Sequence, residues 1–344
     1  MGDNGGTANP PGLDLRRLED HLADRLPGVV QGALSGEVIA GGRSNLTYAV
    51  TDGRTRWVVR RPPLGHVLPT AHDMAREHRV VSALADTEVP VPRTLLLCTD
   101  PEVVGAPFYV MEYVEGVPYR TARQLDAIGA ERTHAVAMTM IDTLVALHAV
   151  DPAAVGLADF GRPEGFLERQ VRRWSKQLEA SRSRELPGID ELRARLAENI
   201  PAGTAPAIVH GDYRLDNLLV GPDDRIRAVI DWEMSTLGDP LTDLALILTY
   251  NSEAMRASTG VSDAHTAEGY PDADEIIARY AAGSGRDITH LDWYVGLAFF
   301  KLAVILEGIH YRYRQGKTVG ADFDRIGEVV PRLVEGGLKY LTGG

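Results

Sequence analysis

The sequence predicts an α+β protein with a small β-rich lobe followed by a larger helical lobe. Short strand-like runs separated by turn residues dominate the first 110 residues, and helical periodicity dominates from about residue 120 onward. The length of 344 residues is in keeping with two lobes, and the chain shows no internal repeat. These patterns place the first lobe at residues 13–111, a connecting hinge at 112–117 and the helical lobe at 118–344.

The first lobe is predicted to follow a short tail. Residues 1–12 are mostly Gly, Asn, Pro and Thr with little to bury, which predicts a disordered segment. Leucines at helical spacing between Leu15 and Leu26 predict the first helix. Asp52 and Gly53 are typical of a hairpin turn between two strands. In chain order, we expect strands at 37–40, 46–50 and 57–60, a helix at 72–85, and strands at 95–97 and 108–111.

Apolar residues that recur every three or four positions predict the helices of the second lobe. These helices are expected at residues 129–149, 164–182, 189–199, 240–250, 273–282, 290–314 and 322–341. The helix at 290–314 is apolar on nearly all sides, so we expect it to be buried. Two β-like segments interrupt the helical pattern, at 207–209 with 218–220 and at 227–230.

The composition limits the classes of partner. Asp and Glu total 48 against 36 Lys and Arg, and the resulting net charge of −12 disfavours general nucleic-acid binding. Cys98 is the single cysteine, which excludes intrachain disulfides and Cys-rich zinc sites. The N-terminus shows no targeting or lipidation pattern, and no apolar run approaches the length of a membrane span. We expect a cytoplasmic protein with small-molecule or protein partners and with no nucleic-acid or membrane partner; the sequence does not identify a protein partner.

The densest polar cluster lies between two apolar, strand-like runs at residues 210–217, and a second short cluster follows at 230–233. Loops held by a rigid scaffold commonly carry catalytic groups. Phosphoryl transfer requires a carboxylate that orients a hydroxyl, together with an amide and a second carboxylate whose oxygens suit Mg²⁺. Asp212, Asn217 and Asp231 supply these three groups.

Three spaced motifs carry a family resemblance. His-Gly-Asp-(four residues)-Asn at 210–217, Ile-Asp-Trp-Glu at 230–233 and Leu-Gly-Asp-Pro-Leu-Thr-Asp-Leu-Ala at 237–245 resemble the aminoglycoside phosphotransferase and choline kinase family, which has a protein-kinase-like fold. Residues 41–48 and 210–217 look most like the branch similar to the kinase domain that is fused to acyl-CoA dehydrogenases. The resemblance covers about residues 30–320. It implies ATP and Mg²⁺ as cofactors and transfer of the γ-phosphoryl group to a hydroxyl of a small molecule.

Carried over by position, the resemblance makes Asp212 the catalytic base that orients the acceptor hydroxyl. It makes Asn217 and Asp231 the ligands of Mg²⁺. Arg214 lies where protein kinases carry a lysine that neutralises the transferred phosphoryl group. Two interpretations of Arg214 stay open, since this cation would either stabilise the phosphoryl group or form an ion pair with a neighbouring carboxylate, Asp216 or Glu233.

The resemblance also implies a nucleotide site in the first lobe. The loop over the ATP phosphates would comprise Gly41, Gly42, Ser44 and Asn45; alternatively, this segment is a plain tight turn. Arg60 stands where the family more often has lysine, paired with Glu77, and we expect activity to survive because Arg keeps the charge. Adenine would be bound at the hinge by Met111, Glu112 and Val114; alternatively, this is a core strand followed by a turn.

The identity of the acceptor is open. Residues 162–184 contain seven Lys and Arg against three Glu, which favours a negatively charged or acyl-CoA-like hydroxylated acceptor if this stretch faces the site. Alternatively, the stretch is a solvated helix face. Aminoglycosides and choline-like amino alcohols are alternative acceptors. A nucleotide-binding pseudokinase regulator is a further alternative, although retention of Asp212, Asn217 and Asp231 argues against it.

Overall fold

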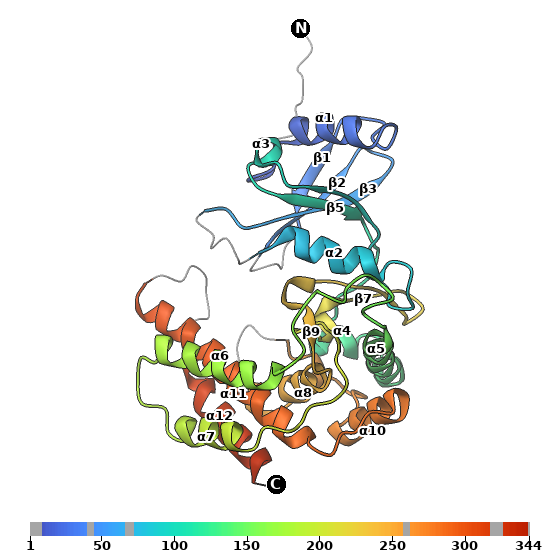
Figure 1. Ribbon diagram of the computed structural model, residues 1–344. Helices are drawn as coiled ribbons and strands as arrows, with labels where there is room; N and C mark the ends of the chain where they lie inside the picture. The colour runs from blue at the N-terminus through green and yellow to red at the C-terminus, as the bar shows by residue number, and fades with distance from the viewer. Residues whose placement is uncertain (1–8, 40–44, 66–71, 257–261, 317–325, 343–344) are drawn as a thin grey trace. The chain divides into compact units, whose positions relative to one another are not determined.

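The computed structural model describes residues 9–39, 45–65, 72–256, 262–316 and 326–342. The chain divides into two compact units (Figure 1). The first comprises Met1–Gly116 and Arg227–Glu233, and the second comprises Val117–Ile226 and Met234–Gly344.

A five-stranded antiparallel sheet forms the centre of the first unit, in the order β1-β2-β3-β5-β4. Its strands are β1 (Ser35–Val38), β2 (Leu46–Thr51), β3 (Arg56–Arg61), β4 (Thr94–Cys98) and β5 (Phe108–Glu112). The predicted hairpin is confirmed between β2 and β3. Gly53 has φ +87° in its turn, and the Asp52 carboxylate accepts the Arg54 and Thr55 backbone N–H groups at 2.9 and 2.7 Å.

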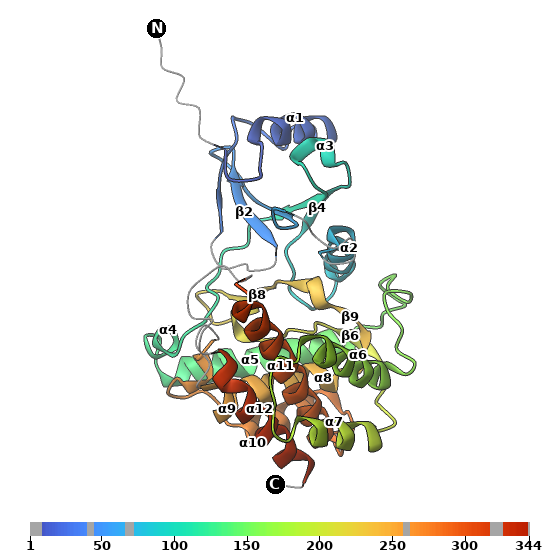
Figure 2. The ribbon, with the colours of Figure 1, turned by 90° about the vertical axis from the view of Figure 1, so that its left-hand side faces the viewer.

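Helices cover both faces of this sheet. Side chains alternate between the two faces along each strand, so that each face has side chains to pack against a helix. Helix α1 (Leu15–Arg25) packs on one face, where Leu18 and Leu22 join a core that includes Tyr48 and Val59. Helix α2 (Met74–Leu84) packs on the other face against β4 and β5. The short helix α3 (Pro101–Val104), which the sequence did not predict, lies beside α1 (Figure 2).

The predicted tail ends earlier than expected. Residues 1–8 lie outside the described residues, but residues 9–12 contact the first unit. Asn9 Oδ1 accepts the N–H of Leu15 at 3.1 Å, and the Pro11 carbonyl accepts the Tyr48 hydroxyl at 2.7 Å. A prediction of disorder from composition therefore fails for residues 9–12, because β2 and α1 offer them hydrogen-bonding partners.

The second unit is mainly helical, as predicted. Its helices are α4 (Ala122–Asp126), α5 (Ala130–Ala149), α6 (Phe166–Ser181), α7 (Ile189–Glu198), α8 (Leu241–Tyr250), α9 (Glu253–Arg256), α10 (Ala273–Ser284), α11 (Leu291–Arg314) and α12 (Ile326–Leu341). Helix α11 packs against α6, α7, α8 and α12, which confirms its predicted burial. By length and composition α11 could cross a membrane, but 78% of its most apolar window is buried, as in a core helix.

Short strands surround the polar clusters predicted from the sequence. They are β6 (Ala207–Val209), β7 (Leu218–Val220), β8 (Ile226–Val229) and β9 (Thr236–Gly238). Within the second unit β6 pairs with β9, a strand that the sequence did not predict. The chain passes from β6 directly into residues 210–217, so that a buried strand fixes the start of this loop.

The division of the chain differs from the prediction in one respect. The sequence predicts a single crossing at residues 112–117, and the structure places one boundary after Gly116. The structure also assigns a second segment, Arg227–Glu233, to the first unit. The Val229 N–H donates to the Pro90 carbonyl at 2.8 Å, and Asp231 pairs with Arg60. These contacts join residues far apart in the chain, so that no local sequence pattern reveals them.

Candidate active site

The loop at 210–217 has its backbone fixed from two sides. Gly211 has φ +87°, and a Cβ atom there would lie 2.7 Å from the Met234 carbonyl oxygen, so that only glycine fits. The backbone N–H groups of His210 and Gly211 donate to the Asp243 carboxylate at 2.7 and 2.8 Å. The residue next to the predicted base is therefore held by the first turn of α8.

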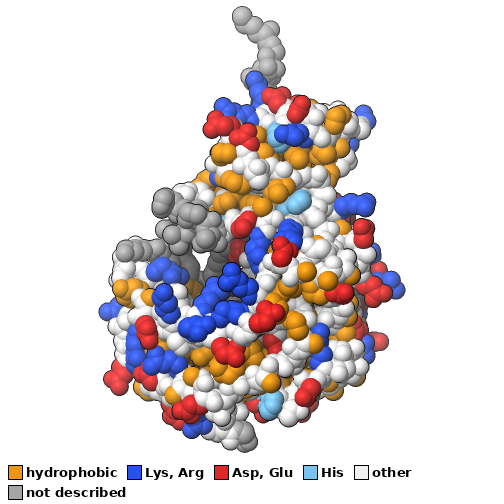
Figure 3. Space-filling view, in the orientation of Figure 1, with side chains coloured by type: hydrophobic (Ala, Val, Ile, Leu, Met, Phe, Trp, Pro, Cys, Tyr) orange, Lys and Arg blue, Asp and Glu red, His pale blue; other side chains and the backbone are white. Residues whose placement is uncertain are grey.

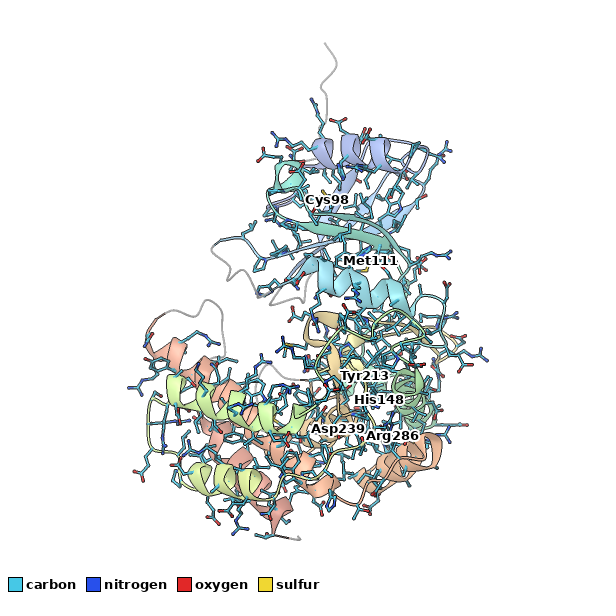
Figure 4. The ribbon with its side chains drawn as sticks, viewed as in Figure 1. Cys98, Met111, His148, Tyr213, Asp239 and Arg286 are labelled. Atoms are coloured by element: carbon cyan, nitrogen blue, oxygen red, sulfur yellow. The ribbon has the colours of Figure 1, made fainter. Side chains whose placement is uncertain are left out.

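Asp243 is itself part of a buried cluster. His148 Nε2 lies 3.3 Å from Asp243 Oδ2, and His148 Nδ1 lies 2.9 Å from the Tyr280 hydroxyl. Burial raises the pKa of Asp243, but the His148 side chain and the Gly211 N–H outweigh burial and lower it overall. Burial lowers the pKa of His148. Figure 4 labels His148 together with Tyr213, whose hydroxyl donates to the Met140 carbonyl at 2.8 Å.

Both carboxylate oxygens of the predicted base, Asp212, accept hydrogen bonds. The Tyr250 hydroxyl donates to Oδ1 at 3.2 Å, and Asn217 Nδ2 donates to Oδ2 at 3.2 Å. Asn217 Nδ2 also donates to the Asp212 backbone carbonyl at 2.9 Å. The structure thus brings Asp212 and Asn217 together as predicted, with the Asn217 amide oxygen left as the atom that suits a cation.

Arg214 forms an ion pair with Asp216, which was one of the two interpretations left open by the sequence. Its NH2 lies 3.0 Å from Asp216 Oδ2, and its Nε lies 3.5 Å from Asp212 Oδ2. Burial raises the pKa of Asp216, while the Arg214 charge lowers it. The guanidinium also lies 5.1 Å from the centroid of the Tyr250 ring. Arg214 therefore lies next to the predicted base, Asp212.

Two residues of this site, Tyr250 and Lys301, were not predicted from the sequence. Lys301 of α11 donates to the Gly211 carbonyl at 3.0 Å, and its Nζ lies 5.9 Å from the Trp174 ring. Burial lowers the pKa of Lys301, although the nearby Asp212 carboxylate raises it. A lone lysine inside an apolar helix is itself a signal, because a buried ammonium requires a polar partner. Tyr250 gives no comparable signal in the sequence.

The predicted nucleotide residues of the first unit include a buried ion pair. Arg60 Nε lies 2.9 Å from Glu77 Oε1, and the Glu77 side chain is 2% exposed. Arg60 also pairs with Asp231, whose own φ is +68°. Burial lowers the pKa of Arg60, but the carboxylates around it outweigh burial and raise it, so that the guanidinium stays charged. The pairing predicted for Arg60 and Glu77 is present in the structure.

The predicted phosphate loop is described only in part. Gly41, Gly42 and Ser44 lie outside the described residues. Asn45 is buried, and its Nδ2 donates to Glu233 Oε2 at 2.8 Å. This bond joins the start of β2 to the segment that carries Asp231.

At the predicted hinge, Met111 is buried in a small core with Val58, Met74 and Tyr109 (Figure 4). The Glu112 N–H donates to the Arg93 carbonyl at 2.8 Å, and the Glu112 carboxylate accepts the Arg93 N–H at 3.0 Å. Val114 follows β5 and is half-buried. Strand β5 is present at this position, and adenine binding by these residues stays a prediction.

The donor atoms suit Mg²⁺ better than a transition metal. Among the residues that the structure describes, no three His, Cys, Asp or Glu side chains gather into a metal-binding group. Mg²⁺ is commonly held by one or two protein oxygens together with phosphates and water. Asn217 and Asp231 each offer a hard oxygen of this kind.

Comparison with protein families decides the class. The model of the phosphotransferase enzyme family matches residues 35–286, which is most of the chain. The chain belongs to this family. The protein is therefore a small-molecule phosphotransferase with a kinase-like fold, and the resemblance drawn from the three motifs is confirmed.

Curated relatives of this phosphotransferase include the branch that the motifs indicated. Acyl-CoA dehydrogenase family member 11 of Rattus norvegicus is 35% identical over 336 residues, covering 95% of this chain and 43% of that protein. Acyl-CoA dehydrogenase family member 10 of Mus musculus is 34% identical over 306 residues, covering 88% of this chain and 28% of that protein. The phosphotransferase thus spans less than half the length of these relatives.

Solved structures confirm the predicted fold class. A putative aminoglycoside phosphotransferase of Ralstonia eutropha is 34% identical to this phosphotransferase, with a TM-score of 0.83 and coverage of 96% of this chain and 98% of that one. An aminoglycoside phosphotransferase in complex with GDP and kanamycin is 16% identical, with a TM-score of 0.63 over 95% of this chain and 99% of that one. The latter shares the fold.

Proposed function

We propose that this phosphotransferase is an ATP- and Mg²⁺-dependent kinase that transfers the γ-phosphoryl group to a hydroxyl of a small molecule. The observation that carries the proposal is the Asp212 carboxylate, held by Asn217 on a loop with a fixed backbone. Asp212 would orient the acceptor hydroxyl and accept its proton while the new O–P bond forms and the bond to ADP breaks. Arg214 would stabilise the charge on the transferred group.

The first unit would bind the nucleotide. Arg60 is held by Glu77 and presents a fork of N–H donors that suits phosphate oxygens. Met111, Glu112 and Val114 would contact adenine. Structural neighbours of the same fold contain GDP or ATP, which supports a nucleotide site without deciding between the two.

Mg²⁺ would be held by the Asn217 amide oxygen and the Asp231 carboxylate, as the family resemblance implies. When bound, it neutralises charge on the ATP phosphates. Arg60 supports the Asp231 side chain through their ion pair. The left-handed backbone conformation at Asp231 is sparsely populated by residues other than glycine and is typical of a functional position.

For the acceptor, we propose a hydroxylated acyl or acyl-CoA compound. Arg172, Arg173 and Lys176 are exposed on α6, and Figure 3 shows Lys and Arg side chains gathered over this helix. The ring centroid of Trp174, on the same helix, lies 5.9 Å from Lys301 Nζ, and Lys301 donates to the Gly211 carbonyl, so that α6 lies near the catalytic loop. Cations at this place would favour an anionic acceptor over a polycationic aminoglycoside.

Two other cations of the basic stretch form ion pairs within the second unit. Arg182 pairs with Asp190, and Arg184 pairs with the fully buried Glu307 of α11. The local charge excess predicted from the sequence therefore overstates the positive charge that is free to meet a substrate.

A panel of hydroxylated acyl-CoAs, hydroxy acids, amino alcohols and aminoglycosides, each incubated with Mg-ATP, tests the proposal. We expect an acyl or acyl-CoA acceptor to gain about 80 Da, the mass of HPO₃, by mass spectrometry. Asp212→Ala should abolish the gain, and full turnover in this variant would disprove the assigned role. Nucleotide binding without transfer to any acceptor would favour a pseudokinase regulator.

A further inference from the structure

Tyr250 contacts both Asp212 and Arg214, the two side chains that act on the reacting groups in the proposed reaction. It is the last residue of α8, and its hydroxyl donates to Asp212 Oδ1 at 3.2 Å. Its ring centroid lies 5.1 Å from the Arg214 guanidinium carbon. Burial, together with the Asp212 charge, raises the pKa of Tyr250, so that its hydroxyl stays a hydrogen-bond donor.

The Asp212 carboxylate requires a fixed orientation to act on an acceptor. The terminal torsion of an Asp side chain has a broad energy profile, so that the carboxylate rotates easily unless both oxygens are held. Asn217 binds Oδ2 and Tyr250 binds Oδ1. Each oxygen has two lone pairs, and these two bonds leave lone pairs for the acceptor hydroxyl.

Helix α8 connects this contact to the loop backbone. Asp243 in its first turn accepts the His210 and Gly211 N–H groups, and Tyr250 follows seven residues later. Residues seven apart lie on the same face of a helix, two turns along. One face of a rigid helix therefore holds both the backbone before Asp212 and the side chain of Asp212.

We propose that Tyr250 is a positioning residue for phosphoryl transfer, which orients Asp212 through its hydroxyl and Arg214 through its ring. This inference rests on the proposed role of Asp212 as the base.

Two substitutions separate the effect of the Tyr250 hydroxyl from the effect of its ring. Tyr250→Phe removes only the hydroxyl, and we expect kcat to fall about tenfold with the KM for ATP unchanged, because a hydrogen bond to a charged group is lost at the reacting centre. Tyr250→Leu removes the ring as well and should lower kcat further. The assay is Mg-ATP hydrolysis without an added acceptor, in which water replaces the acceptor hydroxyl.

A matched control is available in the same unit. The Tyr294 hydroxyl donates to Asp239 Oδ2 at 2.8 Å in a second tyrosine–aspartate bond, which is buried where the Tyr250 bond is half-buried. Tyr294→Phe should lower the melting temperature and leave kcat unchanged. If Tyr250 has only a structural role, Tyr250→Phe will behave in the same way, and the inference is then wrong.

A double-mutant cycle tests the route through Asp212. In an Asp212→Asn background, Tyr250→Phe should cause no further loss of kcat, because the carboxylate that it orients is absent. An equal loss in both backgrounds would overturn the inference. Full turnover in Asp212→Ala instead disproves the role proposed for Asp212, on which this inference rests, whereas full turnover in Tyr250→Phe alone, with Asp212→Ala inactive, disproves only this inference.

Discussion

Arg60 shows how one side chain links several groups of the first unit. Its Nε lies 2.9 Å from Glu77, its NH1 donates to the Thr47 hydroxyl at 3.2 Å, and its NH2 pairs with Asp231. A lysine at this position has one nitrogen and could not reach all three partners in this geometry. Arginine at position 60, where the family more often has lysine, is thus compatible with the proposed nucleotide site.

Substitution of Arg60 tests this arrangement. Arg60→Met should lower kcat/KM for ATP at least about 100-fold, because a preorganised cation is lost. It should lower the free energy of unfolding by about 3 kcal/mol, because Glu77 loses its buried partner. Arg60→Lys should retain more activity than Arg60→Met. Steady-state kinetics and urea denaturation measure these effects, with the exposed Arg54→Met as control; equal activity of the Met and Lys variants would contradict the prediction.

At the scale of elements, α11 carries a single lysine into the catalytic region. Lys301→Met should lower kcat about tenfold, because the Gly211 carbonyl loses its donor and Asp212 loses a neighbouring cation. The free energy of unfolding should change by less than about 1 kcal/mol, because methionine keeps the apolar stem. The exposed Lys339→Met on α12 is the matched control. Unchanged kcat in Lys301→Met would refute a role for this contact.

The contact between α5 and α8 predicts a pH dependence of stability. Burial lowers the pKa of His148 from its ordinary value of 6.5. As the pH falls, the unfolded chain therefore protonates His148 before the folded chain does. The contribution of neutral His148 to the free energy of unfolding is present above pH 6.5 and is lost below it. The charged groups that face His148 are Asp243, Asp239 and Arg286, with the Tyr280 hydroxyl beside them.

Denaturation between pH 5 and pH 8 measures this effect. The wild type should lose stability as the pH falls below 6.5, and His148→Gln should show a flatter dependence in the same range. His134→Gln on the same helix α5, where the His134 side chain is 44% exposed and lies beside Glu275, is the matched control. An identical dependence in wild type and His148→Gln would contradict the prediction.

At the scale of the whole molecule, binding of the proposed Mg-ATP complex should stabilise the native state, with Asn217 and Asp231 as the proposed ligands of Mg²⁺. Mg-ATP should raise the melting temperature by several degrees, because a ligand at 100 times its Kd stabilises the native state by about 2.7 kcal/mol. Removal of Mg²⁺ with EDTA should reduce this shift. Asp231→Asn should lose the Mg²⁺-dependent part, and the exposed Glu115→Gln should keep it. A shift that does not depend on Mg²⁺ would exclude the proposed metal site.

Most elements of the fold follow from local patterns. The helix spacing of Leu15, Leu18 and Leu22, and the hairpin signal at Asp52 and Gly53, both lead to the observed structure. The short elements α3, α4, α9 and β9 were missed, because a segment of three to five residues contains too little of a period to detect.

By itself, the sequence determined the fold class, the order of the longer elements and the motif residues Asp212, Asn217 and Asp231, because these depend on patterns within single segments of the chain. Only the tertiary structure decided what supports them. Tyr250 is 38 residues from Asp212, Lys301 is 90 residues from Gly211, and Asp231 is 171 residues from Arg60. Packing of helices and strands brings these pairs together, and local sequence patterns do not predict such long-range contacts.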